Sequence, residues 1–235
     1  MYTQSIGLVG GFGAYATLNF YKRILESFSG DSERDIPHIY MDCDFTMPSR
    51  TRALLYDEEY DLVVKQISDS VSKLINFGSD YIIFVCGTAH YFLDDIYQIV
   101  PQCRQKVINI IEVLGKQLVS NGVNEVLVIA AEGALMKGVY ENKLHNINCV
   151  TPSEENYKEI RFFIEAVKSN NITPLTIDRY IDFLYRFNQK NIILGCTEFP
   201  ILTETARKYS PDALVDFVFY DPLEATVQYL KNVLY

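Results

Sequence analysis

The chain has 235 residues, of which 49% are hydrophobic and 22% are charged, a composition that allows a buried core and excludes an intrinsically disordered protein. Its formal net charge is −9, and because an acidic surface repels phosphate backbones, we expect no nucleic-acid partner. The sequence contains no apolar run of about eighteen residues and no secretory signal at its start. We therefore expect no membrane span, no export and a cytoplasmic location.

Short β-branched runs alternate with longer helical patterns along the whole chain. The predicted strands cover residues 5–10, 36–42, 81–85, 106–111, 125–130, 191–194 and 214–218. Helical patterns between and after them cover residues 14–28, 62–77, 154–169, 176–189 and 222–234. This alternation predicts an α/β protein with mostly parallel sheets whose faces are covered by helices.

The chain contains an approximate internal repeat. Residues 6–22, IGLVGGFGAYATLNFYK, align with residues 126–142, VLVIAAEGALMKGVYEN, so that Gly13 falls on Gly133 and Phe20 on Tyr140. A second correspondence places a strand that ends before Cys86 on a strand that ends before Cys196. Two correspondences in the same order, about half a chain length apart, predict two pseudo-symmetric α/β lobes. We assign residues 1–112 and 215–235 to the N-terminal lobe and residues 113–214 to the C-terminal lobe.

The five cysteines do not form a recognisable framework. They are Cys43, Cys86, Cys103, Cys149 and Cys196, and an odd, widely spaced set without a CxxC pair indicates neither disulfides nor zinc. A free cysteine is most often a small buried hydrophobic residue, which is one reading of all five. Two of them, however, follow matched strands, and ligands of open α/β sheets bind at the carboxyl ends of strands. Thiols that flank one cleft from opposite lobes suit the removal of a proton from one face of a carbon and its return to the other.

Other polar residues near the predicted strand ends allow two interpretations each. Arg50 could clamp a substrate carboxylate or lie on the surface, and His90 could be a general acid/base or a helix-face histidine. Glu198 and Lys168 could serve a ligand or simply suit the dipoles of their helices. The turn Gly10–Gly13 does not match the GxGxxG dinucleotide motif, and the sequence has neither a P-loop nor a GxSxG elbow.

Four segments in chain order resemble the motifs of a known family. GLVGGFGAYATLNFYKRI, MPSRTRAL, VCGTAH and LGCTEFPIL are similar to segments of the aspartate/glutamate racemase superfamily, specifically its aspartate racemase branch. The resemblance implies two flavodoxin-like lobes with an active site between them, and a homodimer. It also implies a racemase acting on aspartate or glutamate that requires neither pyridoxal phosphate nor a metal, with Cys86 and Cys196 as the catalytic pair.

The resemblance further implies a set of substrate-binding residues. Arg50 matches an arginine that holds a substrate carboxylate, and Lys168 matches a lysine near the side-chain carboxylate. The other positions implied in binding an amino-acid or dicarboxylate substrate are Gly11, Thr51, Gly87, Thr88, Thr197 and Glu198.

Four positions depart from the pattern of the family. Gly87 stands where asparagine is usual, Ala14 stands where proline is common, and Ala131 and Ala134 lie in a turn that usually contains threonines. A missing hydrogen bond to a charged group costs about 1.5–3 kcal/mol. Two alternatives therefore stay open: an isomerase, decarboxylase or lyase that acts on another carboxylate with the same scaffold, and a non-catalytic ligand-binding relative.

Overall fold

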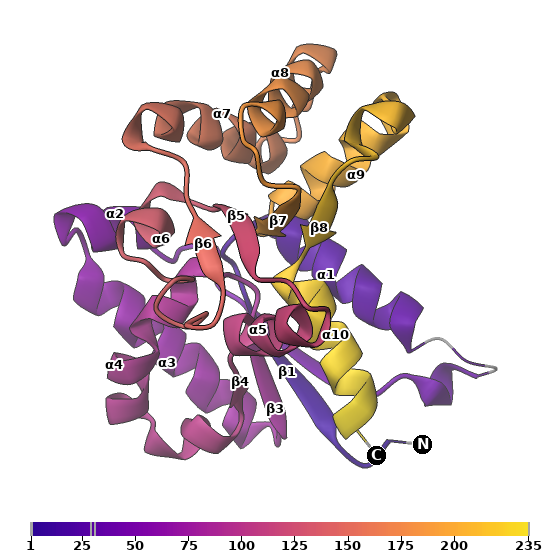
Figure 1. Cartoon of the computed structure of the whole chain (residues 1–235). Helices are drawn as coiled ribbons and strands as arrows, with labels where there is room; N and C mark the ends of the chain where they lie inside the picture. Colours follow the sequence, from indigo (N-terminus) through magenta and orange to yellow (C-terminus); the bar gives the residue numbers. More distant parts are fainter. Residues whose placement is uncertain (1, 29, 31, 235) are drawn as a thin grey trace.

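The computed structural model describes residues 2–28, 30 and 32–234, and these form two four-stranded parallel sheets (Figure 1). The first sheet has the order β2-β1-β3-β4, with β1 at Ser5–Gly10, β2 at His38–Cys43, β3 at Tyr81–Phe84 and β4 at Val107–Ile108. The second has the order β6-β5-β7-β8, with β5 at Glu125–Ile129, β6 at Asn148–Val150, β7 at Asn191–Leu194 and β8 at Val218–Tyr220. The same strand order in both sheets confirms the predicted α/β fold with two similar lobes.

The hydrophobicity of each strand follows its place in the sheet. All residues of the inner strand β1 are buried, because helices cover both faces of a parallel sheet. The edge strand β2 has no fully buried residue and is correspondingly more polar. The buried inner strands thus fix the positions of the turns that follow their carboxyl ends.

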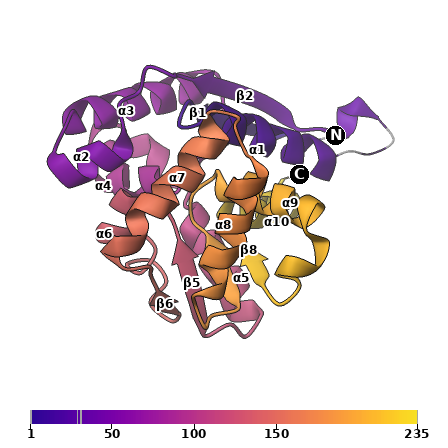
Figure 2. The same cartoon turned by 90° about the horizontal axis from the view of Figure 1, so that it is seen from above.

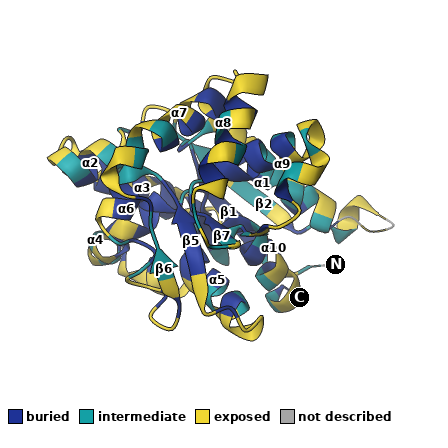
Figure 3. Ribbon diagram, turned by 45° about the horizontal axis from the view of Figure 1, so that its top comes forward, coloured by how far each residue is buried: buried dark blue, intermediate teal, exposed yellow. Residues whose placement is uncertain are grey.

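The helices lie on the faces of the two sheets, with their buried sides toward the sheets and their exposed sides outward (Figure 3). They are α1 (Ala14–Ser27), α2 (Arg50–Tyr56), α3 (Tyr60–Asn76), α4 (Leu93–Ile99), α5 (Ile110–Ser120), α6 (Glu132–Met136), α7 (Tyr157–Lys168), α8 (Pro174–Tyr185), α9 (Phe199–Tyr209) and α10 (Pro222–Val233). In the described part of the chain, none of these helices combines the length and apolarity needed to cross a membrane.

Two hydrophobic clusters show how the lobes join. The smaller cluster packs α3 and α4 against one face of the first sheet. The larger one begins on the other face of that sheet and continues through α1, α5 and α10 into the second lobe. Helices α5 and α10 lie side by side between the sheets, and α1 also contacts α7 of the second lobe (Figure 2). The two lobes therefore share one core, which fixes the carboxyl ends of their strands relative to each other.

Several predicted boundaries were wrong for local reasons. The strand expected at residues 106–111 ends at Ile108, because the side chain of Asn109 accepts hydrogen bonds from the first backbone N–H groups of α5. The strand expected at residues 214–218 begins only at Val218, after a short 3-10 helix at Pro211–Leu214. The three-residue strand β6 was not predicted, since its flanks are polar and its length is too short for a pattern.

The C-terminal segment differs from the predicted division of the chain. Residues 215–235 were assigned to the N-terminal lobe, but β8 pairs with β7 and belongs to the second sheet. Helix α10, which follows it, contacts α5 and α1. The chain therefore returns toward the first lobe only after Tyr220. The assignment of the other residues to two lobes stays a prediction.

Candidate active site

A cavity of about 300 Å³ lies between the lobes, at the carboxyl ends of β3 and β7. Nine of the ten site residues that the sequence singled out line it: Arg50, Thr51, Cys86, Gly87, Thr88, Lys168, Cys196, Thr197 and Glu198. The tenth, Gly11, does not line the cavity. Its φ is +85°, and a Cβ there would overlap the backbone of Asp44, so this glycine serves the turn after β1. Its neighbour Phe12 lines the cavity instead.

Cys86 is held through its own carbonyl group. It lies two residues after the end of β3 and is partly exposed to the cavity. The buried His90 donates from Nδ1 to the Cys86 carbonyl oxygen at 2.9 Å, while its Nε2 accepts from the Ile110 N–H at 3.4 Å. Burial lowers the pKa of His90 to about 4, so the ring is neutral. These two hydrogen bonds tie the Cys86 turn to the start of α5, and His90 itself lies outside the cavity lining.

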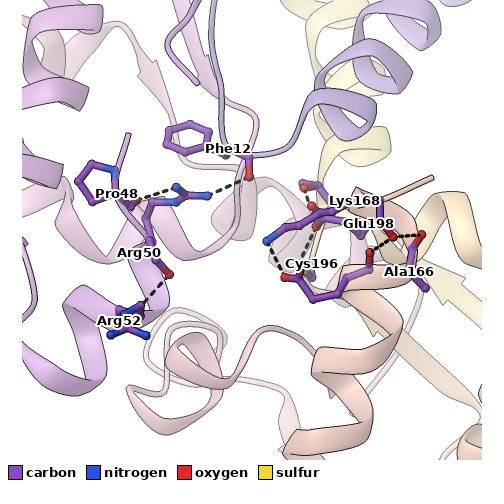
Figure 4. Close-up of polar contacts among 12 residues, drawn as sticks. Phe12, Pro48, Arg50, Arg52, Ala166, Lys168, Cys196 and Glu198 are labelled. Carbon is purple, nitrogen blue, oxygen red and sulfur yellow. Dashed lines mark hydrogen bonds and ion pairs between the residues drawn. The ribbon is translucent and has the colours of Figure 1, made fainter. Parts of the chain in front are cut away.

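Cys196 is held through its thiol group. It lies two residues after the end of β7, and its Sγ donates to Oε2 of Glu198 at 2.9 Å (Figure 4). Burial raises the pKa of Cys196 well above its usual value, and the adjacent Glu198 carboxylate raises it further. The resting Cys196 is therefore a thiol whose proton points to a carboxylate.

Glu198 lies where the two lobes meet. Its side chain is 3% exposed, and a Cβ on Gly13 of the first lobe would lie only 2.6 Å from its Oε1. Gly13 occupies the N-cap position of α1, and Glu198 occupies that of α9, without a capping hydrogen bond from its side chain. Helix N-termini favour a negative charge, which helps to keep a carboxylate at a buried position. A side chain at position 13 would therefore displace the Glu198 carboxylate from its present place.

Arg50 projects into the cavity from the N-terminus of α2. Its two terminal nitrogens donate to the carbonyl oxygens of Pro48 at 2.8 Å and Phe12 at 2.9 Å, as Figure 4 shows. The guanidinium carbon also lies 5.0 Å from the centre of the Phe12 ring. Within the described residues, its Nε–H is buried without an acceptor. Arg50 is therefore a fixed cation with a free donor, an arrangement suited to a carboxylate ligand.

Lys168 enters the cavity from the C-terminal end of α7, in the other lobe. Burial alone would lower the pKa of Lys168, but the nearby Glu198, Cys196 and Glu165 outweigh it and raise this pKa. Its Nζ lies 3.4 Å from Glu165, and 39% of its side chain is exposed. The ammonium is therefore a second cation on the side of the cavity opposite Arg50 (Figure 4).

Several lining residues were missed in the sequence. One face of α7 contributes Tyr157, Ile160, Arg161, Ile164 and Glu165. These residues precede Lys168 by 3, 4, 7, 8 and 11 positions, which places them on the same face of the helix, so the predicted helix and the position of Lys168 were sufficient to find them. The missed Glu132 at the start of α6 pairs with Arg161. Among the described residues, no group of three or more histidine, cysteine, aspartate or glutamate side chains is arranged to hold a metal ion.

Comparisons with known proteins agree with this fold. Residues 9–230 match the Asp/Glu/Hydantoin racemase family. The fold is similar to that of Picrophilus torridus aspartate racemase, with a TM-score of 0.79 at 24% identity over 97% of this chain and 94% of that one. It is also similar to glutamate racemase from Francisella tularensis in complex with D-glutamate, with a TM-score of 0.71 at 19% identity over 98% and 80% of the two chains. A glutamate racemase from Sulfurihydrogenibium is 26% identical over 67% of this chain, and the match spans 60% of that relative's length.

Proposed function

Because the chain belongs to the Asp/Glu/hydantoin racemase family, we propose that it interconverts the L and D forms of an acidic amino acid, aspartate or glutamate, without a cofactor. The observation that supports this most is one cavity bordered by Cys86 from the first lobe and Cys196 from the second. Each thiol lies two residues beyond the end of an equivalent strand. Two proton carriers on opposite walls suit a two-base reaction.

The proposed reaction moves one proton off the α-carbon and another onto it. In one direction the Cys86 thiolate removes the α-proton, and the Cys196 thiol gives its proton to the opposite face of the planar carbanion. Glu198 accepts the hydrogen bond of that thiol before transfer. In the reverse direction Glu198 takes the Cys196 proton, the resulting Cys196 thiolate removes the α-proton, and the Cys86 thiol gives its proton to the carbanion. This direction leaves Cys86 as a thiolate and Glu198 protonated, and the Glu198 proton returns to Cys86 through solvent. In the forward direction the proton that Cys86 gained returns to Cys196 in the same way, so no net proton is gained or lost.

The cations would bind the substrate and lower the energy of the carbanion. We assign the α-carboxylate to Arg50, since its buried Nε–H lacks an acceptor among the described residues. We assign the side-chain carboxylate to Lys168 on the opposite wall. The α-proton of an amino acid is very weakly acidic, and fixed donors near the carboxylate stabilise the charge that develops when it leaves. The partly apolar lining of the cavity strengthens that effect.

Exchange of the α-hydrogen in D₂O tests this proposal. Wild type should racemise L- and D-aspartate or L- and D-glutamate and place deuterium at the α-carbon of the product. Cys86→Ser and Cys196→Ser should each reduce racemisation by about 10²–10⁴-fold, the usual contribution of a general acid or base. Cys149→Ser is the matched control, because Cys149 is a partly buried thiol outside the cavity lining.

The outcomes separate the alternatives. Wild-type racemisation rates in both active-site variants would contradict the two-thiol reaction. Deuterium exchange without racemisation, or consumption of another carboxylate in a substrate screen, would favour a different carbanion reaction on this scaffold. Ligand binding without any exchange would favour the non-catalytic alternative.

The proposal includes a homodimer, which the resemblance to the racemase family implies. Light scattering on the purified chain should give about twice the mass of one chain. The mass of a single chain across the accessible concentration range would contradict this part of the proposal.

A further inference from the structure

Tyr140 lies directly behind both cysteine turns. Its side chain is 1% exposed, and its hydroxyl donates to the carbonyl oxygen of Gly195 at 2.7 Å. Gly195 is the residue immediately before Cys196, so this hydrogen bond fixes the peptide group that orients the second thiol. Tyr140 does not line the cavity, and the proposed reaction does not use it.

The same side chain is packed against the turn of the other lobe. A Cβ on Gly87 would overlap the Tyr140 hydroxyl oxygen and lie 2.7 Å from the Gly195 carbonyl oxygen. A Cβ on Gly195 would lie 3.0 Å from two carbons of the Tyr140 ring. Such approaches are closer than packed side chains tolerate. The ring and its hydroxyl thus separate the residue after Cys86 from the residue before Cys196.

Tyr140 cannot exchange protons with the substrate at neutral pH. Burial raises the pKa of Tyr140 well above its usual value, and the two nearby cysteines raise it further. The hydroxyl is therefore neutral, and its proton is held by the Gly195 carbonyl. Its contribution must come from its position.

We propose that Tyr140 is a positioning residue that sets the spacing and orientation of the Cys86 and Cys196 turns, and that its hydroxyl requires glycine at position 87. This inference rests on the proposed two-cysteine function. It also explains one departure from the family pattern: the asparagine usual after the first cysteine has a Cβ, for which the Tyr140 hydroxyl and the Gly195 carbonyl leave no room. In this chain the hydroxyl fills the space behind the first turn.

A double-mutant cycle tests the inference. Gly87→Ala should lower kcat by about 100-fold with little change in KM, because a displaced catalytic group can cost that much. Tyr140→Phe keeps the ring but frees the Gly195 carbonyl, and kcat should fall by about tenfold. The double variant should be no more impaired than Gly87→Ala alone, because removal of the hydroxyl relieves the closest contact of the new methyl group.

Tyr180→Phe is the matched control. Tyr180 is a buried tyrosine of the same lobe whose hydroxyl bonds to Thr203 at 2.7 Å, away from the cavity lining. This variant should lose a similar amount of thermal stability as Tyr140→Phe but retain the wild-type kcat. Equal losses of kcat in both tyrosine variants would show that Tyr140 acts only through stability.

Other outcomes would also overturn the inference. A folded Gly87→Ala variant with wild-type kcat would do so, as would a double variant whose loss is the full product of the single losses, about 1,000-fold. Alkylation of Cys86 and Cys196 by iodoacetamide, followed by peptide mass spectrometry, gives a readout independent of racemisation. A changed ratio of the two alkylation rates in Tyr140→Phe, with wild type inactive on amino acids, would support the positioning role and reject the proposed function. An unchanged ratio would reject the positioning role.

Discussion

The two cysteine turns occupy equivalent places in the two sheets but have different polar surroundings. Each thiol lies two residues after the third strand of its sheet order. The Cys86 turn is anchored by the neutral imidazole of His90, which binds its carbonyl. The Cys196 turn is anchored by Tyr140, and the Cys196 thiol itself donates to Glu198.

This difference shows that the two lobes repeat a topology without repeating the chemistry. When Cys86 is aligned with Cys196, Thr88 takes the place of Glu198. Only the second thiol therefore has an internal carboxylate that can take or return its proton. The pseudo-symmetric fold places the two thiols on opposite walls of the cavity. The residues next to each thiol differ between the lobes, and this difference determines which group can accept each thiol proton.

Replacement of Glu198 should have the largest effect on this asymmetry. An amide at position 198 keeps the shape of the side chain but cannot accept the thiol proton, so we expect Glu198→Gln to lower kcat by about 10²–10⁴-fold. The pKa of Cys196 should fall at the same time, because the carboxylate that raises it is gone. Steady-state kinetics and the pH profile of Cys196 alkylation measure the two effects.

Glu204→Gln is a suitable control for that experiment. Glu204 lies on the outer side of α9 and pairs with Lys208 at 2.7 Å, so its replacement should leave kcat and the Cys196 profile unchanged. A Glu198→Gln variant with full activity would show that Cys196 exchanges its proton with another group. The carboxylate of Glu198 would then not distinguish the proton transfer at Cys196 from that at Cys86.

The features predicted from sequence are those encoded within one strand–turn–helix unit. The run YIIF before Val85-Cys86 and the run NIIL before Gly195-Cys196 each specify a buried strand with a thiol beyond its end. Their repetition was sufficient to predict the two lobes and the meeting of both thiols in one cavity. Arg50 and Lys168 were first considered because they lie near predicted strand and helix ends, and the racemase resemblance then gave each of them an expected role.

The contacts between lobes were not predictable in the same way. The approach of Glu198 to Gly13 joins residues that are far apart in the sequence, and no local pattern specifies it. The same holds for Tyr140 behind Gly87: the repeat aligned Tyr140 with Phe20 but gave no reason for the hydroxyl. Such contacts depend on the relative placement of the sheets, which the shared core around α5 and α10 determines.

The imidazole of the first turn gives a prediction about stability and pH. The pKa of His90 is about 4 in the fold, below the ordinary value of about 6.5 in an unfolded chain. Between these values the unfolded chain binds a proton that the native protein does not, so stability should fall as the pH falls from about 6.5 to 4, by about 3 kcal/mol from this group. Below pH 4 His90 adds no further loss.

Urea unfolding at pH 7 and pH 4.5 measures this contribution. His90→Gln should lower stability at pH 7, because the two backbone anchors are lost, but its loss between the two pH values should be smaller than that of wild type. His145 is exposed, so the variant His145→Gln should show the same pH dependence of stability as wild type. An identical pH dependence in His90→Gln and wild type would mean that other groups, and not the anchor of the first turn, control the acid sensitivity.

The two cations extend the comparison to substrate binding, with the smallest expected effects. Arg50 is fixed by two carbonyl groups, whereas Lys168 is 39% exposed and lies 3.4 Å from Glu165. Arg50→Lys should therefore raise KM by about 10- to 100-fold, because the planar fork is lost while the charge remains. Lys168→Met should raise KM for aspartate or glutamate by about 3- to 10-fold, since exposed ion pairs contribute less. Initial-rate kinetics of the two variants measure both values.

Alanine as a test substrate separates the roles of the two cations, because it has an α-carboxylate but no side-chain carboxylate. Lys168→Met should leave any activity on alanine unchanged, whereas Arg50→Lys should reduce it as strongly as the activity on aspartate. If Lys168→Met were the more damaging variant for both substrates, the α-carboxylate would be bound by the second lobe. The first lobe would then supply little beyond Cys86, and the asymmetry between the turns would extend to the whole cavity.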